Sequence, residues 1–491
     1  MMIRNLKLYE INTRVWLKRF GESAKLSSIP DKILDDFQAK GLNIIWLMGI
    51  WKTCPSLIDR CCYEPDLITA YGNALKDWSR EDLIGSPYSI DFYQPEPSVA
   101  SEEELLILKE KLNKRGIKLF LDFVPNHFSA ETRFLKSNPE IFLQADEETF
   151  IKNSYGFFKD EVSKKIFAHG RDPLFSPWTD TVQVNYFNPA TRKFMIDTLL
   201  KISELCDGVR CDMAMLVLNN VFYNTWAGIL NKANYSKPEN EFWSDAIRSI
   251  KNKKPDFIFL AEAYWDLEWN LQQIGFDYIY DKRLLDRLSV HDVAGIKAHL
   301  TAEKDYQLKL VRYIENHDEP RAVSKFGVQK SLAAAAIIST IPGMKFYHDG
   351  QFEGKKIKLP VQLGRESNEK INLTVQNFYT KMLEITKHPI FIEGDWEQLE
   401  PISAGGNNQS FQNILGWRWI LGTEERIIVV NYSDTTSQCR LKIQMRSFAP
   451  KLILIDLLTE EIYKRLPEEI KTIGLFIELK AYNMHIFTSI S

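Results

Sequence analysis

Strand-like apolar stretches and helix-like stretches alternate along the first three quarters of this 491-residue chain. Residues 44–47 form an unbroken apolar run, which is typical of a parallel strand covered on both faces. From residue 7 to residue 347 the alternation gives about eight strand–helix units. Repeated units of this kind close into a parallel sheet, so we expect an α/β protein built on a (β/α)8 TIM barrel.

Two parts of the chain depart from this alternation. Residues 128–186 are punctuated by prolines and glycines and predict an irregular subdomain inserted after the third strand. From residue 414 onward, short apolar segments separated by turn residues predict an antiparallel β domain. We therefore expect a barrel of residues 1–127 and 187–388, an inserted domain of residues 128–186, and a C-terminal β-sandwich domain of residues 389–491.

Composition is that of an ordinary globular protein, with 45% hydrophobic and 26% charged residues and a net charge of −3. This balance offers no electrostatic basis for binding nucleic acid or a membrane surface, so we expect neither as a partner. The six cysteines show no metal-ligand spacing, and the N-terminus lacks a signal-peptide pattern. We expect a cytoplasmic protein; the sequence is silent on its oligomeric state.

Polar residues follow four of the predicted strands at the point where each strand ends. In a parallel barrel all strand C-termini open on one face, where these side chains would converge. Three carboxylates, an arginine and two histidines in one pocket are hard to explain as structure alone, and crowded carboxylates differ in pKa. The residues are Asp122 with Asn126 and His127, Arg210 with Asp212, Glu262, and His317 with Asp318.

Arg210 and Asp212 lie two residues apart in a predicted strand and therefore point to the same face. Arg210 would keep Asp212 ionised and oriented, which makes Asp212 a candidate nucleophile. On this stretch alone, a structural ion pair at the sheet rim is an equal alternative. The full set of strand-end residues is the equipment for cleaving a glycosidic bond, in which one carboxylate attacks and another donates a proton.

Four motifs in order carry a resemblance to a known family. They are DFVPNH at residues 122–127, GVRCD at residues 208–212, Glu262 with Trp265 behind it, and NHD at residues 316–318. Together they resemble the signature regions of the α-amylase family, glycoside hydrolase family 13. The segments around Val184 and at residues 343–351 are similar to two further regions of that family.

The resemblance implies a retaining glycoside hydrolase that cleaves α-glucosidic bonds, α-1,4 bonds of malto-oligosaccharides or α-glucans above all. Asp212 would be the nucleophile that forms a covalent glucosyl intermediate. Glu262 would be the general acid and then the base. Asp318 would hold ring hydroxyls and favour the distorted transition state, while Arg210 would orient Asp212.

The remaining implied roles concern substrate binding and support. His127 and His317 would hydrogen-bond the sugar in the cleavage subsite. Tyr88, in the irregular stretch at residues 51–97, occupies the position of the family's stacking aromatic, although an aromatic packed on the barrel rim is an alternative. Asp122 and Asn126 are assigned supporting roles only.

Two departures from the family pattern leave the subgroup open. Many α-amylases follow the nucleophile with Lys-His, which serves substrate and calcium, but here Met213 and Ala214 follow it. We therefore expect no required cofactor and no metal site, with calcium left open. The exo-acting members pair an Asp after the stacking Tyr with an Arg; here Arg321 is present as a substrate-binding candidate, but Ser89 replaces the Asp. Asp91 is a nearby substitute or a loop residue.

Three alternatives follow from the same residues. An α-glucan transglycosylase uses the same first half-reaction but a sugar acceptor. A non-catalytic sugar-binding protein on the same barrel would typically lack a catalytic carboxylate, whereas all three are present here. An unrelated barrel enzyme for phosphate or metal chemistry would want a glycine-rich anion loop, and Gly350 and Gly354 are flanked by acidic and basic residues alike.

Overall fold

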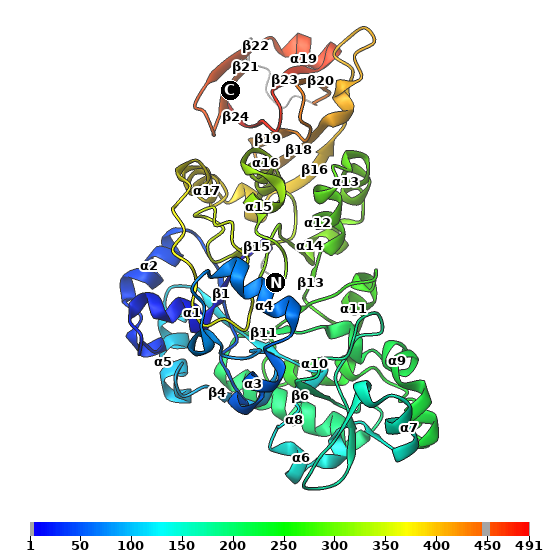
Figure 1. The fold of residues 1–491 in the computed structure, drawn as a ribbon. Coiled ribbons are helices and arrows are strands. Elements are labelled where there is room, and N and C mark those ends of the chain that lie inside the picture. The colour runs from blue at the N-terminus through cyan, green and yellow to red at the C-terminus, as the bar shows by residue number, and fades with distance from the viewer. Residues whose placement is uncertain (1–3, 444–451, 491) are drawn as a thin grey trace.

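Eight parallel strands, which lie between residues 7 and 348, close into a barrel (Figure 1). The computed structural model describes residues 4–443 and 452–490. Neighbours around the barrel follow chain order, and β15 closes the ring by pairing with β1. The expected TIM barrel is thus confirmed. Its strands are β1 Lys7–Asn12, β2 Ile44–Met48, β5 Lys118–Phe123, β11 Gly208–Cys211, β12 Ile258–Ala261, β13 Tyr278–Tyr280, β14 Leu310–Arg312 and β15 Met344–His348.

Each barrel strand is buried on both faces, which is why strands such as β2 are continuous apolar runs. Alternate residues such as Trp46, Phe120 and Phe346 fill the barrel interior, and the residues between them face the helices. Gly208 in β11 is needed for this packing, because a Cβ there would lie 2.4 Å from the Phe120 ring.

Helices between the strands cover the outside of the barrel. Helix α5, Glu102–Asn113, begins with a capping box between Ser101 and Glu104. It buries Leu105, Leu108 and Leu112. The other helices that cover the barrel include α2 Asp31–Ala39, α8 Pro189–Leu205, α10 Phe242–Lys251, α12 Lys282–Ser289, α16 Val328–Thr340 and α17 Leu373–Ile385.

The stretch at residues 51–97 is more regular than its sequence suggested. Strand β3, Trp51–Thr53, pairs antiparallel with β4, Ile90–Pro95. The chain between these two strands contains helix α4, Pro65–Ala74. The pairing contains two register shifts. Strands this short and irregular leave no clear two-residue alternation in the sequence, which explains why the expectation of an irregular loop missed them.

The insertion after β5 is built from short strands. Strand β6, His127–Ser129, pairs with β10, Thr181–Gln183, and so brings both ends of the insertion together at the barrel. A second, three-stranded sheet contains β7 Gln144–Ala145, β8 Phe157–Lys159 and β9 Ile166–Ala168.

The C-terminal part consists of antiparallel strands, as expected. One sheet has the order β16-β18-β19-β24-β21-β22 and the other β17-β20-β23. Side chains of both sheets share a hydrophobic core. The larger sheet also contacts the barrel helices, because Trp419 Nε1 donates to the Thr340 carbonyl at 2.6 Å and Tyr432 donates to the Leu288 carbonyl at 2.8 Å. The strands are β16 Asp395–Leu399, β17 Pro401–Ile402, β18 Ile414–Leu421, β19 Glu424–Asn431, β20 Ser437–Leu441, β21 Leu452–Asp456, β22 Ile462–Arg465, β23 Leu475–Leu479 and β24 Met484–Ile490.

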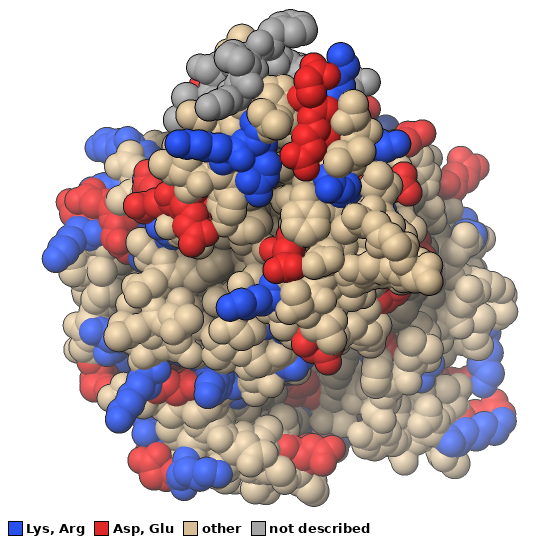
Figure 2. Space-filling view, turned by 90° about the horizontal axis from the view of Figure 1, so that it is seen from above, with Lys and Arg blue, Asp and Glu red and all other residues tan. Residues whose placement is uncertain are grey.

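Surface charge and the length and polarity of the helices are relevant to nucleic-acid and membrane partners. Acidic and basic side chains lie interspersed on the face shown in Figure 2, in keeping with the small net charge of −3. In the described part of the chain, every helix is too short or too polar to cross a membrane.

Candidate active site

The strand-end residues lie together at the C-terminal mouth of the barrel, and Arg210 is at their centre. Arg210, in β11, is fully buried. Its Nη1 lies 2.6 Å from Asp212 Oδ1 and 3.9 Å from Asp122 Oδ1, and its Nη2 lies 2.7 Å from Glu262 Oε2. One guanidinium therefore faces three carboxyl groups from β5 and from the ends of β11 and β12, which leaves the cluster short of positive charge.

Glu262, directly after β12, is one of two carboxyl groups beside Arg210 whose environment favours a bound proton. Burial raises the pKa of Glu262 to about 7, with Asp212 and Asp318 adding to the rise and Arg210 opposing it. Tyr264 OH donates to Glu262 Oε1 and the Met213 amide donates to Oε2, both at 2.7 Å. Met213 adopts a left-handed conformation with φ of 42°. These contacts hold the carboxyl group in one orientation.

Asp122 is more deeply enclosed than Asp212 and is tied to the barrel wall. Its Oδ2 accepts from the Gly49 amide at 2.9 Å and its Oδ1 from Trp46 Nε1 at 3.2 Å. Burial raises the pKa of Asp122 to about 7, against the opposing effect of Arg210. Gly49 has φ of +75°, and a Cβ there would lie 2.8 Å from Pro87. The geometry suits the supporting role expected for Asp122.

Asp318 and His317 follow β14 and form a charged pair across the mouth. His317 Nε2 lies 3.0 Å from Asp318 Oδ2, and His317 Nδ1 lies 2.5 Å from Glu10 Oε1. Burial acts to lower the pKa of His317, but Asp318 and Glu10 outweigh it and raise this pKa well above its ordinary value. Desolvation acts to raise the pKa of Asp318, but His317 outweighs it and holds this pKa below the usual range. Asp318 is thus ionised, and its side chain is 53% exposed.

Tyr88 lies over the His317 ring. The two rings stack with centroids 5.4 Å apart, and Tyr88 OH lies 3.0 Å from His317 Nε2. The Arg210 guanidinium lies 5.4 Å from the Tyr88 ring centroid. Tyr88 therefore belongs to the same cluster as Arg210 and His317, on the side of the mouth where β4 begins.

His127 and Asn126 lie at the entry to the inserted domain. His127 packs against Trp178 with ring centroids 5.2 Å apart, and burial lowers the pKa of His127. The main-chain and side-chain oxygens of Asn126 accept hydrogen bonds from Gln183 Nε2 at 2.9 and 3.0 Å. Both Asn126 oxygens are therefore engaged within the chain. Residues 4–443 and 452–490 contain no group of three or more His, Cys, Asp or Glu side chains that could hold a metal ion.

Arg321 is buried and its guanidinium is engaged within the chain. Its Nη1 donates to Glu315 Oε1 at 2.8 Å and to the Asp349 carbonyl at 2.7 Å. Ser89 Oγ donates to the Asp180 carbonyl at 2.7 Å, and Asp91 pairs with Arg133 at 3.3 Å. Asp91 therefore faces the inserted domain and not Arg321, so the arginine–aspartate clamp of exo-acting members is not assembled from these residues.

Two residues of the cluster were not identified from the sequence. Glu10 lies within β1 and contacts His317, 307 positions away in the chain. A carboxylate inside a buried strand was the available signal. Tyr264 follows Glu262 by two residues, but nothing in the local pattern separates it from any other aromatic near a strand end.

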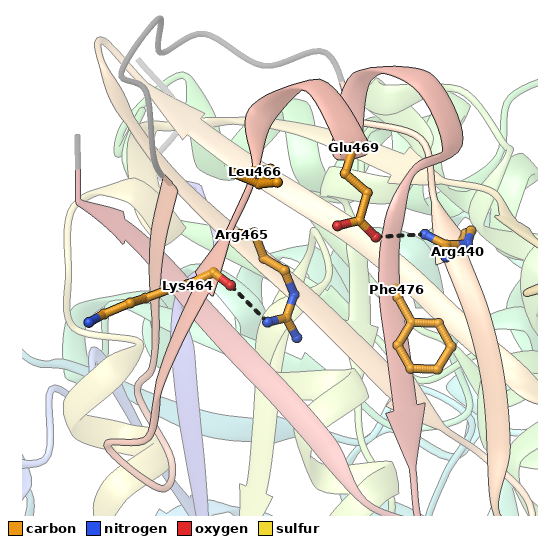
Figure 3. Close-up of a pocket in the computed structure, with 6 residues that line it drawn as sticks. All are labelled: Arg440, Lys464, Arg465, Leu466, Glu469 and Phe476. Atoms are coloured by element: carbon orange, nitrogen blue, oxygen red, sulfur yellow. Dashed lines mark hydrogen bonds and ion pairs between the residues drawn. The ribbon is translucent and has the colours of Figure 1, made fainter.

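A large cavity in the C-terminal domain has a lining different from that of the barrel mouth (Figure 3). It measures about 620 Å³ and is lined by Arg440, Lys464, Arg465, Leu466, Glu469 and Phe476. Its single carboxylate, Glu469, pairs with Arg440 at 3.3 Å. A cavity with one neutralised carboxylate lacks the acid and nucleophile that the barrel mouth has, so the barrel mouth is the candidate active site.

Comparisons with known proteins show the family to which the chain is similar. The family model for the alpha amylase catalytic domain matches residues 41–381. Alpha-amylase 3 of Dictyoglomus thermophilum is 22% identical over 388 residues, which are 74% of this chain and 67% of that protein. Maltase A1 of Drosophila melanogaster is 21% identical over 348 residues, which are 57% of this chain and 58% of that protein. The chain thus spans about three fifths to two thirds of the length of these two relatives.

A solved structure shares the fold over nearly the whole length. The noncanonic maltogenic alpha-amylase AmyB of Thermotoga neapolitana matches with a TM-score of 0.70 and 19% sequence identity, covering 99% of each chain. The family model covers well over half of the chain, and the barrel, the insertion and the antiparallel C-terminal domain are all present. This chain belongs to the α-amylase family.

Proposed function

We propose that the protein is a retaining glycoside hydrolase that cleaves α-glucosidic bonds, chiefly α-1,4 bonds of malto-oligosaccharides or α-glucans. The observation that carries the proposal is the sharing of Arg210 between Asp212 and Glu262, at 2.6 and 2.7 Å. Two nitrogens of one guanidinium hold the two carboxyl groups close together. A short separation, about 5 Å, is the arrangement of retaining enzymes, whereas inverting enzymes leave room for a water.

In the first half-reaction Asp212 attacks the anomeric carbon while Glu262 donates its proton to the leaving glycosidic oxygen. The bond from the anomeric carbon to the leaving oxygen breaks, and a bond to the Asp212 carboxylate forms. Arg210 holds Asp212 Oδ1 and leaves Oδ2 for the attack. With a pKa of about 7, a substantial fraction of Glu262 is protonated at neutral pH, as a general acid requires.

In the second half-reaction Glu262 acts as the base. It takes a proton from water, and the resulting hydroxide releases the sugar from Asp212 with its original anomeric configuration. If a sugar hydroxyl takes the place of water, the same step forms a new glycosidic bond. Transglycosylation is therefore the alternative function, because it uses the same residues.

Asp318, His317 and Tyr88 bind the sugar at the point of cleavage. The exposed, ionised carboxylate of Asp318 accepts hydrogen bonds from ring hydroxyls, and protonated His317 keeps it ionised. The Tyr88 ring offers an apolar face to the sugar. His127 supplies a ring nitrogen to the sugar, and Arg321 contributes by positioning Glu315 and the segment after β15.

We also propose a cytoplasmic location. All six cysteines are free thiols, and a reducing compartment keeps thiols in this state.

The proposal is tested by incubating the purified protein with maltoheptaose and separating the products by length. Shorter sugars from the wild type, and none from Asp212→Asn, are the expected result. Products longer than maltoheptaose would assign the transglycosylase alternative. No turnover of maltoheptaose, trehalose, sucrose or isomaltose, together with measurable sugar binding, would replace the enzyme with a sugar-binding protein.

A further inference from the structure

A cavity of about 540 Å³ opens beside Asp318. His317 and Asp318 form part of its wall, and the segment that follows β15 forms another part through Lys356 and Lys358. Helix α4 contributes Asn73. Asp212 and Glu262 do not line it. The proposed function assigns Asp318 to the sugar that remains bound to the protein, so the cavity adjoins that sugar.

The wall of this cavity carries more cationic than anionic side chains, and Lys358 also helps to lower the pKa of Asp318. Lys358 Nζ donates to the main-chain carbonyl of Asp318 and forms no ion pair in the described residues. For Lys356 the structure describes a main-chain hydrogen bond but no partner of the ammonium group within residues 4–443 and 452–490. Arg321 is neutralised by Glu315, and Asp318, the single carboxylate on the wall, already pairs with protonated His317.

The main chain that carries the two lysines is held in place on several sides. Glu369 accepts the amides of Lys356 and Ile357 at 2.8 and 3.3 Å. Lys355 pairs with Glu366 at 2.6 Å, and Glu366 in turn pairs with Arg19 at 2.9 Å. This fixed backbone presents two ammonium groups to the cavity at little further cost in chain entropy, as a pre-organised binding site does.

We propose that this cavity binds an oxyanion, a phosphate ester carried by the sugar on the Asp318 side of the site. Two lysines that form no salt bridge within the described residues favour an anionic group over a neutral glucan, because a phosphate group carries close to two negative charges and three acceptor oxygens. The proposal deepens the proposed function, on which it rests, by naming a phosphorylated α-glucoside as the preferred substrate class. Free inorganic phosphate has the same chemistry and is the second source to be distinguished.

Equilibrium binding tests the cavity without any need for turnover. The probes are maltose and maltose bearing a phosphate on O6 of its non-reducing glucose, titrated into the Asp212→Asn variant by calorimetry. We expect the phosphorylated sugar to bind about tenfold more tightly or better. Adding Lys356→Gln or Lys358→Gln should remove most of that preference, and Lys356→Arg should retain it.

Lys370→Gln is the matched control, because Lys370 lies on the same segment but does not line the cavity. It should leave the preference unchanged. Inorganic phosphate that binds with a Lys356-dependent affinity, with no preference between the two sugars, would support the oxyanion site and assign free phosphate as its source. Equal binding of both sugars in all variants, with no phosphate binding, would overturn the proposal.

Kinetics of the wild type separate this inference from the proposed function. Turnover of neutral maltotriose with no gain from a 6-phosphate on its non-reducing glucose would refute the anion site and leave the glycosidase intact. A Lys356-dependent gain in kcat/KM for the phosphorylated sugar would support both. Failure to cleave either sugar, with phosphate-dependent binding retained, would refute the proposed function but still support the oxyanion site.

Discussion

Two fully buried arginines in the same barrel hold their carboxylates in opposite ways. Arg210, at the mouth, is shared by Asp122, Asp212 and Glu262. Arg312, at the end of β14, pairs with Asp281 and also contacts His299 Nε2 at 3.2 Å and the Pro342 carbonyl at 3.0 Å. The first cluster has more carboxyl groups than cations, and the second has a cation and a histidine for one carboxylate.

The difference shows in the pKa of each carboxyl group. Burial acts to raise the pKa of Asp281, but Arg312 and His299 outweigh it and hold this pKa at about 2. Burial raises the pKa of Glu262 and of Asp122 to about 7, and Arg210 only partly opposes it. Burial alone therefore does not create a proton donor. A shortage of positive charge does, which distinguishes a catalytic cluster from a structural one.

The largest expected effect is the loss of activity in Asp212→Asn. The amide removes the nucleophile while keeping the shape, so kcat/KM on maltoheptaose should fall by about a thousandfold or more. The melting temperature, followed by circular dichroism, should change little because the amide oxygen of the variant would still accept a hydrogen bond from Arg210. Retention of more than a tenth of the activity would place the nucleophile elsewhere.

Arg312→Met should affect stability and not chemistry. It leaves Asp281 buried without its arginine, which costs about 3–5 kcal/mol of folding free energy. Urea unfolding measures this loss, and kcat/KM of the folded fraction should stay near the wild-type value. Arg312→Met combined with Asp281→Leu should regain part of the stability, because no unpaired charge remains.

Arg465→Met, at a half-buried position in the C-terminal domain, is the control for loss of an arginine. A loss of stability in Arg312→Met no larger than in this control would refute the structural role of the Arg312 cluster. If Arg312→Met lowered kcat and left stability unchanged, Arg312 would act in catalysis as Arg210 does, and the contrast between the two arginines would be wrong.

The two clusters should give stability opposite dependences on pH. The pKa of Glu262 rises from 4.5 to about 7 on folding, so the folded chain binds the extra proton and stability falls as pH rises through this window. The pKa of Asp281 falls from 3.8 to about 2, so its contribution is present above about 4 and is lost as pH falls toward 2. Thermal melting from pH 2 to pH 8 measures both slopes.

Glu262→Gln should flatten the slope between pH 4.5 and 7 only, and Asp281→Asn the slope below pH 4 only. Asp122→Asn should behave like Glu262→Gln, because burial raises the pKa of Asp122 to about 7 as well. If Glu262→Gln and Asp281→Asn changed the slope of stability in the same pH window, the two clusters would not differ in their pH dependence.

The smallest expected effect comes from Tyr264→Phe. The Tyr264 hydroxyl donates to Glu262 at 2.7 Å and so favours the ionised carboxylate. Losing one such bond is worth about 1 kcal/mol, so the pH at which kcat/KM falls by half on the alkaline side should rise by about one unit or less. A downward shift in this pH would show that Tyr264 does not donate to the ionised form.

Much of the fold was predictable because the barrel repeats one local pattern. Runs such as residues 44–47 are apolar since both faces of each strand are covered, and the capping box at Ser101 marks where a helix begins. The hairpin of β3 and β4 was missed, because its strands are short and their register shifts twice. The bounds of the inserted domain and of the C-terminal domain remain sequence-based expectations.

The sequence alone determined that Asp122, Arg210, Asp212, Glu262 and Asp318 would meet, since each lies near or beyond the C-terminal end of a strand and all strands of a parallel barrel end on one face. Closure of the barrel decided which side chains touch. It brings Glu10 to His317, lets Arg210 serve three carboxyl groups, turns Asp91 toward Arg133, and gathers Lys356 and Lys358 beside Asp318. These contacts join residues far apart in the chain, and no local pattern encodes them because they depend on the packing between elements.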